Sequence, residues 1–522
     1  MSFQSLLMSN RSVANAVMSR IPGASHDKRG RQYAVQVAKA AIGQTEAYPA
    51  FLREQTGAVP SVQTFEEFER LPLMDKGNYI NYERFSVQQL CLGGDPSRAY
   101  TIEKSSGHAG VSYYWLRTAA EDAMFPKYLE FAFAQFYGIE TKRTLILLTL
   151  ALGTWTSGEK MAQALRQVAS TEKYPLTVMA PGMKADEVLE IVSDLSHLYD
   201  QTIIVGYPPF VKMVLDEGVR RGIEWPALHV KIGLGGEGYS EQWRDCVAER
   251  IGVDPDRELL AISGGYGAAD VGMSVGREYP LTVLIRRLCM KDEALASRLF
   301  YEGGRPDGAL PSLLQYSPAT VFAEEIGGEL VFTALSGIPI VRYNIHDRGS
   351  VLGFDEVMST VRECGHDPVA MLAERGYAQS EIWNLPFFYC FGRTDGTVTV
   401  NGANVYPEHI QAALSIARDT EILGFRISVE TDPSSQDERL VVLLEHRDDR
   451  ADVGATESHY CRVLVEGLLA VNSEFRYIHE RAAHLTTPRV EVHRRGGGPF
   501  ASELGSIKRA YNPRSDALCH RE

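Results

Sequence analysis

Short, mostly apolar segments separated by helix-like stretches run through the middle of the chain. Five of these segments, each four to six residues long, have the pattern of buried strands: 143–148, 176–179, 202–205, 229–234 and 259–262. Strands of a parallel sheet are apolar on both sides because helices cover both faces. The pattern therefore predicts an α/β fold with a mainly parallel sheet.

The pattern changes on either side of this region. Residues 1–90 have helical periodicity, with a Thr cap and acidic first turn at Thr64. From about Leu310, short strands such as 328–333 and 340–343 predict a small barrel-like or second sheet. Residues 411–515 have the pattern of a small α+β unit, with its best strand at 440–444.

The segment 391–410 joins these parts. Thr397 to Val400 alternates as a half-buried strand does, and Asn401-Gly402 is a strong hairpin signal. Two glycine turns so close together are typical of a surface hairpin, and also of a hinge between domains. We predict an N-terminal domain over residues 1–394 and a mobile C-terminal domain over residues 395–522.

Composition narrows the class of protein. The 522 residues are 44% hydrophobic and carry a net charge of -14, which argues against a nucleic-acid partner. Seven scattered cysteines without a C-x-x-C pair are typical of reduced thiols, and predict a cytoplasmic protein. We find no signal peptide and no apolar run of about 18 residues, and therefore expect no membrane span.

Glycine-rich turns follow several of the predicted strands. Ser105-Ser106-Gly107-His108-Ala109-Gly110 lets the backbone approach a phosphate, although no Gly-Lys-Ser/Thr closes it as in a P-loop. A small polar turn explains the same residues equally well. Because ligands of parallel sheets bind at the carboxyl ends of the strands, other strand ends are candidate pocket residues: Trp155, Tyr207, Phe210, Gly235 and Gly264. Each aromatic residue among them has the alternative of packing under its own loop.

A carboxylate follows the glycines at 264–267. Asp270 next to a phosphate cradle is a reasonable Mg²⁺ ligand, and a helix cap is the alternative.

The order and spacing of these motifs resemble the adenylate-forming superfamily, most closely its phenylacetate–CoA ligase branch, from about residue 70 to the end. Ser105, Ser106, Gly107 and Gly110 resemble its phosphate loop, and Gly235-Gly236-Glu237 resembles its adenine-binding segment. Tyr266-Gly267 to Asp270 is similar to its Tyr-Gly-x-x-Glu motif, whose acid binds Mg²⁺. Asp347 stands where the ribose-binding aspartate does, Arg393 is similar to the hinge arginine, and Lys508 to the mobile catalytic lysine.

The resemblance implies a large α/β domain followed by a small C-terminal lid. It also implies ATP-dependent conversion of a small-molecule carboxylic acid to acyl-AMP, with Mg²⁺, and acyl transfer that is usually to coenzyme A. Mg²⁺, backbone N–H donors and one lysine offset the repulsion between two anionic substrates without a general base. A homodimer is compatible with this class of enzyme.

Three departures from the family pattern keep alternatives open. His108 and Ala109 replace two threonines, Asp270 is shorter than Glu, and Gly396 replaces an acidic hinge residue. The first hypothesis is a ligase for a flat, aromatic acid that forms a thioester. The second is an adenylating enzyme of natural-product biosynthesis whose acceptor is an amine or carrier protein, or whose acid is unusual, such as nitrite. The third is a non-catalytic nucleotide-binding relative.

Overall fold

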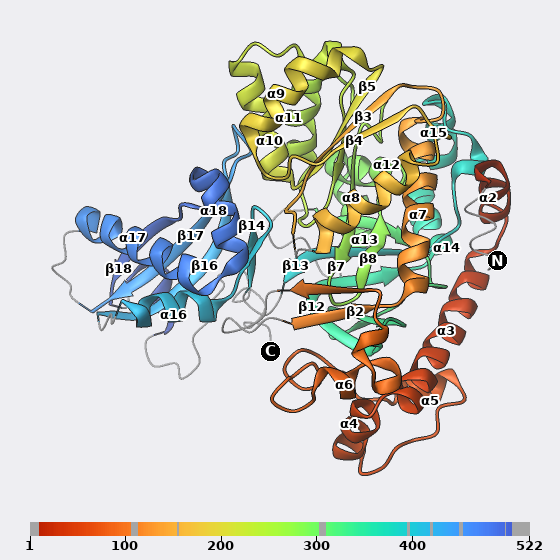
Figure 1. Cartoon of the computed structure of the whole chain (residues 1–522), viewed down its shortest axis with the longest axis horizontal. Coiled ribbons are helices and arrows are strands. Elements are labelled where there is room, and N and C mark those ends of the chain that lie inside the picture. Colours follow the sequence, from red (N-terminus) through yellow and green to blue (C-terminus); the bar gives the residue numbers. More distant parts are fainter. Residues whose placement is uncertain are drawn as a thin grey trace.

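The computed structural model describes residues 10–105, 113–153, 156–301, 310–393, 397–417, 421–447, 453–495 and 497–503 (Figure 1). One 11-stranded sheet forms its centre, in the order β10-β11-β12-β13-β9-β8-β7-β6-β5-β3-β4. The bounds of these strands are β3 Thr144–Thr149, β4 Leu176–Met179, β5 Gln201–Gly206, β6 Lys231–Leu234, β7 Ile262–Ala268, β8 Gly272–Arg277, β9 Ser312–Tyr316, β10 Phe322–Ile326, β11 Glu329–Ala334, β12 Ile340–Leu352 and β13 Phe387–Arg393.

The strands from β4 to β7 are parallel, and this half of the sheet confirms the predicted α/β class. Every residue of β3 and β5 is buried, as expected for strands covered on both faces. One predicted boundary is wrong: we expected a strand over residues 259–262, whereas β7 begins at Ile262 and includes the glycines that follow it. Residues 259–261 come before the strand.

The strands from β8 to β13 pair in antiparallel fashion. We expected a small barrel-like or second sheet here, and the strands instead continue the main sheet through the β8–β9 pairing. The predicted strand 340–343 extends to Leu352, so that Asp347 lies within β12.

Helices accompany both halves of the sheet. The N-terminal helices α3, α4 and α5, shown in red in Figure 1, lie beside the antiparallel half, and Thr64 caps α5 through a capping box. The helices of this large part are α2 (Arg11–Met18), α3 (Gly23–Gln44), α4 (Ala47–Thr56), α5 (Phe65–Glu69), α6 (Val87–Leu90), α7 (Ala119–Tyr137), α8 (Thr156–Ala169), α9 (Ala185–Leu195), α10 (Pro208–Arg220), α11 (Glu241–Ile251), α12 (Pro280–Lys291), α13 (Glu293–Phe300), α14 (Phe354–Glu363) and α15 (Pro368–Glu374).

Two hairpins stand apart from the main sheet. β1 (Thr101–Ser105) pairs with β2 (Tyr113–Arg117), on either side of the predicted phosphate loop. β14 (Val398–Val400) pairs with β15 (Ala403–Val405) around Asn401-Gly402, which confirms the predicted hairpin. The proposed domain boundary at 394/395 falls outside the described residues and stays a prediction.

The remaining elements form a group beside the large sheet, blue in Figure 1. We call residues 397–503 the C-terminal unit. Its three-stranded sheet has the order β16-β17-β18, and the predicted strand 440–444 lies in β17. Its elements are α16 (Pro407–Ile416), β16 (Ile422–Thr431), β17 (Glu438–His446), α17 (Val453–Val471), α18 (Ser473–Thr486) and β18 (Arg489–Arg494). Of the helices that the structure describes, none combines the length and the apolar character that a membrane crossing requires.

Candidate active site

Tyr266 and Asp347 meet at the centre of the sheet, as the sequence motifs predict for a shared site. The Tyr266 hydroxyl, on β7, donates a hydrogen bond of 2.5 Å to Asp347 Oδ2, on β12. Burial and the Asp347 charge raise the pKa of Tyr266 well above its usual value, so the phenol keeps its proton. Arg393 lies directly opposite Asp347 in the β12–β13 register. The structure therefore brings together three residues that lie far apart in the sequence.

A second tyrosine–aspartate pair joins β12 to the turn between β7 and β8, and includes a lysine. The Tyr343 hydroxyl donates to Asp270 Oδ2 over 2.7 Å, and Lys76 Nζ lies 2.9 Å from the same oxygen. Both side chains of this ion pair are nearly buried, with 13% of Lys76 and 5% of Asp270 exposed. Burial disfavours the ammonium form, but Asp270 outweighs this effect and the pKa of Lys76 is raised. Lys76 is therefore a permanent cation at this position.

Sequence reasoning missed Lys76. Two backbone hydrogen bonds carry its segment to β12: Met74 N–H donates to the Arg342 carbonyl over 3.1 Å, and Asn344 N–H donates to the Met74 carbonyl over 2.8 Å. This pairing depends on residues more than 250 positions apart. No local pattern around Lys76 could have indicated it.

The surroundings of Asp270 show whether the residues present could hold Mg²⁺. The described part of the chain contains no group of three or more His, Cys, Asp or Glu side chains that could hold a metal ion. The cation next to Asp270 is the Lys76 ammonium, which donates to the oxygen that a metal would share. A metal ion held by protein side chains alone therefore does not fit this arrangement. A magnesium ion shared between Asp270 and a bound polyphosphate stays a prediction, and we derive no chemical step through it.

Tyr207 links the predicted adenine segment to the hairpin of the C-terminal unit. A Cβ atom added to Gly236 would lie 2.6 Å from the Tyr207 ring, and one added to Gly402 would lie 3.2 Å from it. Both glycines have a positive φ, of 90° and 85°. Tyr207 is thus packed between the two turns, and its hydroxyl lies 3.1 Å from Ser157 Oγ.

Glu237 lies at the same contact. The backbone N–H groups of Asn401 and Gly402 donate to its carboxylate. Burial and repulsion by Glu438 nevertheless raise the pKa of Glu237 well above its usual value. Two acidic side chains therefore face each other where the hairpin meets the large sheet.

Polar contacts join other parts of the C-terminal unit to the large part of the molecule. Lys212 on α10 is 1% exposed, and its ammonium lies 2.7 Å from both Asp216 and Asp437. The Leu152 N–H donates to the Tyr477 hydroxyl over 3.2 Å. Ion pairs of a buried lysine are geometrically demanding, so these contacts define one orientation of the unit.

The other predicted site residues lie at the end of β1, directly after β6 and within β7. Ser105 Oγ accepts a hydrogen bond of 2.9 Å from Trp115 Nε1. A Cβ on Gly267 would approach the Ser274 nitrogen to 3.0 Å, and one on Gly264 would approach the Tyr239 ring to 3.0 Å. Gly235 N–H donates to the Gly206 carbonyl over 3.3 Å.

The remaining predicted residues are either buried in the core or outside the described residues. Phe210 is fully buried in the hydrophobic core around the parallel strands, which matches the alternative of packing beneath its own loop. Ser106, Gly107, Gly110, Trp155 and Lys508 lie outside the described residues. Their assignments stay predictions.

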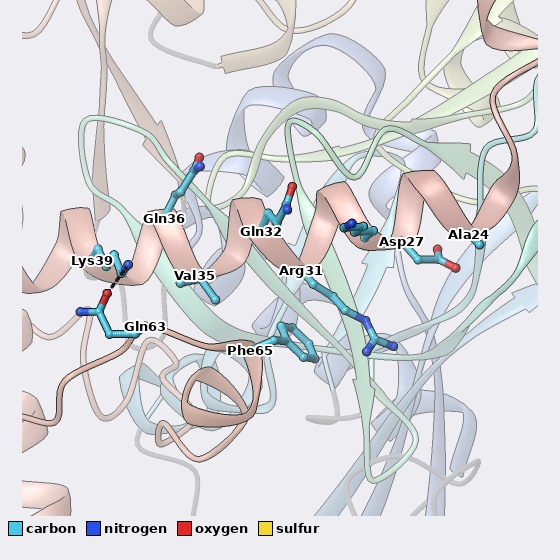
Figure 2. Close-up of a pocket in the computed structure, with 10 residues that line it drawn as sticks. Ala24, Asp27, Arg31, Gln32, Val35, Gln36, Lys39, Gln63 and Phe65 are labelled. Atoms are coloured by element: carbon cyan, nitrogen blue, oxygen red, sulfur yellow. Dashed lines mark hydrogen bonds between the residues drawn. The ribbon is translucent and has the colours of Figure 1, made fainter.

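A surface groove of about 800 Å³ lies elsewhere, along the exposed side of α3 (Figure 2). Polar and charged side chains line most of it, and Lys39 Nζ bonds to Gln63 Oε1 over 2.7 Å, as the dashed line in Figure 2 marks. None of the predicted site residues belongs to its lining.

Comparisons with known proteins give a match in fold. No protein-family model and no curated protein matches the sequence. Among solved structures, a 2-hydroxyisobutyryl-CoA ligase in complex with 2-HIB-AMP and CoA superposes with a TM-score of 0.58. The two chains are 16% identical, and the match covers 94% of this chain and 89% of that one. An acyl acid amido synthetase in complex with 2,4-DB covers 98% of this chain and 96% of its own, at 13% identity and a TM-score of 0.45.

Proposed function

We propose that this chain, which has the fold of the adenylate-forming enzymes, uses ATP to adenylate a carboxylic acid and then transfers the acyl group to an acceptor. The observation that carries the proposal is the meeting of Tyr266, Asp347 and Arg393 at the centre of the sheet. The ion pair of Lys76 and Asp270 adds a cation: Asp270 lies in the turn between β7 and β8, and Lys76 follows the bridge from Met74 to β12. These are the residue types that bind a ribose and a phosphate.

The division of roles follows from the chemistry of each side chain. A carboxylate accepts hydrogen bonds from two hydroxyls, so Asp347 is the ribose-binding group, held in position by Tyr266. Glu237 and its glycine neighbours line the adenine position. Arg393 and Lys76 supply positive charge next to the phosphates, and Lys508 is the third cation in this proposal.

The first half-reaction then needs no general base. A carboxylate oxygen of the acid attacks the α-phosphorus of ATP and forms a mixed anhydride with AMP. The bond from that phosphorus to the bridging oxygen breaks, and the electron pair leaves with pyrophosphate. The cations offset the repulsion between the carboxylate and the polyphosphate. Losing one donor of this kind costs roughly 3 kcal/mol of transition-state stabilisation.

In the second half-reaction a nucleophile attacks the acyl carbon and AMP leaves. We propose coenzyme A as the acceptor, because the 2-hydroxyisobutyryl-CoA ligase with the similar fold is described in complex with CoA. An amine is the second candidate, and the amido synthetase carries an amide-forming activity in its name. A carrier protein as acceptor and nitrite as acid remain alternatives from the sequence.

The acid and the assembly belong to the proposal as well. Phe210 belongs to the core, and the acid pocket that we propose keeps the other predicted residues, Tyr207, Trp155, Gly235 and Gly264. Its two aromatic members favour a flat, aromatic acid. A magnesium ion, a cytoplasmic location, a homodimer and a role in natural-product biosynthesis remain predictions. The clustering of Asp347, Arg393 and Lys76 disfavours a relative that binds nucleotide without catalysis.

A pyrophosphate-release screen tests the proposal. Aromatic acids, aliphatic acids and nitrite are each presented with ATP, with and without coenzyme A or an amine mixture. We expect pyrophosphate only when a suitable acid is present, and a dependence on coenzyme A only for complete turnover. Lys508→Ala and Lys76→Ala should each lower the rate at least tenfold. Lys184→Ala, at a lysine whose side chain is 62% exposed, is the matched control and should have no effect. Acid-independent ATP consumption in all arms would refute the assignment.

A further inference from the structure

The β1–β2 hairpin forms the stem of the predicted phosphate loop and is a two-stranded sheet of its own. Its outer face is exposed, with Ile102 at 56% and Tyr114 at 44%. Its inner face is buried, with Glu103 at 5%, Trp115 at 0% and Arg117 at 1%. The contacts of the inner face therefore set where the stem lies relative to the large sheet.

Arg117 connects this inner face to the loop that carries Asp270. Its Nε lies 2.8 Å from Glu103 Oε2, and its Nη2 donates to the carbonyl oxygen of Ala269. Ala269 directly precedes Asp270 in the chain. A guanidinium that binds a main-chain carbonyl at this point fixes the peptide from which the Asp270 side chain projects.

Glu103 is held in turn from the other side. Its Oε1 lies 2.9 Å from Lys160 Nζ on α8, and that ammonium lies 2.8 Å from Asp122. The charge of Arg117 is thus already compensated within the stem. Its additional bond to Ala269 is not needed to neutralise the guanidinium. The bond instead fixes the position of the Ala269 carbonyl relative to the stem.

Trp115 makes a second connection from the stem to the same acid. Its Nε1 donates to Ser105 Oγ over 2.9 Å, at the residue that begins the predicted phosphate loop. Its ring packs edge-on against Tyr343, with centroids 6.3 Å apart and an interplanar angle of 80°. Tyr343 in turn donates to Asp270 Oδ2. Two side chains of β2 thus act on the same acid: Arg117 holds the peptide before Asp270, and Trp115 packs against the tyrosine that bonds to it.

We propose that Arg117 and Trp115 are positioning residues that fix the stem of the phosphate loop relative to the Asp270–Lys76 pair, and so set the site for the ATP phosphates. This inference rests on the proposed function. It concerns residues that touch no substrate in the proposal and act through Ala269, Ser105 and Tyr343.

The test separates ATP binding from folding. Arg117→Lys keeps a cation next to Glu103 but removes the forked donor that reaches Ala269. We expect a rise of about 10- to 100-fold in the KM for ATP, as for the loss of one charged hydrogen bond, with the KM for the acid unchanged. Trp115→Phe keeps an aromatic ring but loses the donor to Ser105, and should raise the KM for ATP severalfold. Direct titration of each variant with ATP should show the same order of Kd values.

Arg375→Lys is the matched control. Arg375 also donates through its guanidinium to main-chain carbonyls, of Asp256 and Met371, in a part of the molecule remote from the stem. It should lower the melting temperature without changing the KM for ATP. If Arg117→Lys behaves like this control, or raises the KM for the acid as much as that for ATP, the positioning role is refuted while the proposed function stands. If the wild-type chain neither binds nor consumes ATP, the proposed function fails and this inference with it.

Discussion

Replacing Glu278 with Gln should destabilise the protein strongly, because this carboxylate is part of a fully buried ionic network. Glu278 Oε1 accepts hydrogen bonds of 2.8 Å from Arg244 and 3.0 Å from Arg286. Its Oε2 accepts from the Tyr239 hydroxyl over 2.6 Å and from Gly264 N–H over 2.8 Å. The exposed fractions of the charged side chains are 1% for each arginine and 2% for Glu278.

The magnitude follows from the charges that remain. Glu241, which is 0% exposed, is the other fully buried carboxylate next to these two arginines. In Glu278→Gln one buried positive charge is left uncompensated, and the amide nitrogen cannot accept from Tyr239 or Gly264. Breaking a buried pair in this way typically costs about 3–5 kcal/mol. The free energy of unfolding should fall by that amount.

Urea unfolding at neutral pH, followed by tryptophan fluorescence, measures this loss. Trp243 is a suitable reporter, because its ring lies 5.1 Å from that of Tyr239. Asp200→Asn is the matched control, since it also removes a carboxylate from an arginine, Arg143, but at an exposed site where 65% of Arg143 and 41% of Asp200 are accessible. The control should cost less than about 1 kcal/mol. An equal, small loss in both variants would refute the reasoning.

Three further predictions concern other charged groups. His26 is buried, and burial together with Arg29 lowers its pKa to about 4, so its contribution to stability is present above pH 6.5 and lost as the pH falls toward 4. In wild type, the free energy of unfolding should fall between pH 7 and pH 4, and His26→Gln should reduce this fall by up to about 3 kcal/mol in urea titrations. The same fall in variant and wild type would contradict the prediction. The pKa of Glu237 is raised, mainly by burial and then by Glu438, so its contribution is present at acidic pH and lost as the pH rises through the folded-state pKa. Glu237→Gln should therefore melt at a higher temperature than wild type at pH 8 and at the same temperature near pH 4. A difference of equal size at both pH values would argue against a raised pKa of Glu237. Asp437→Asn leaves Lys212 paired with Asp216 and, because Asp437 is 62% exposed, should cost about 1 kcal/mol in urea unfolding. No loss would show that Asp437 does not hold the C-terminal unit.

The parts of the fold that were predictable are those that local pattern determines. β3 and β5 have apolar centres, at 145–148 and 203–205, and the structure buries both strands completely. Asn401-Gly402 adopts the positive φ angles that a tight hairpin needs, of 53° and 85°. The start of β7 was misplaced because three of its seven residues are glycines, which have low strand propensity, and neighbouring strands impose the extended conformation.

Part of the candidate site was predictable because local motifs identify some of its residues. Tyr266, Asp347 and Arg393 were identified through motifs and lie together. Lys76 was missed because its position depends on the pairing of Met74 with β12. The contact of Glu237 with the Asn401-Gly402 turn joins residues that lie far apart in sequence, and no periodicity encodes it.

The most direct test of the central claim is a single-turnover reaction with ATP and a panel of acids, without any acceptor, analysed by mass spectrometry. We predict an acid–AMP anhydride and an equal amount of pyrophosphate from the wild-type chain, and neither from Asp347→Ala. Formation of ADP and phosphate, or of an acyl-AMP in undiminished amount by Asp347→Ala, would contradict the account.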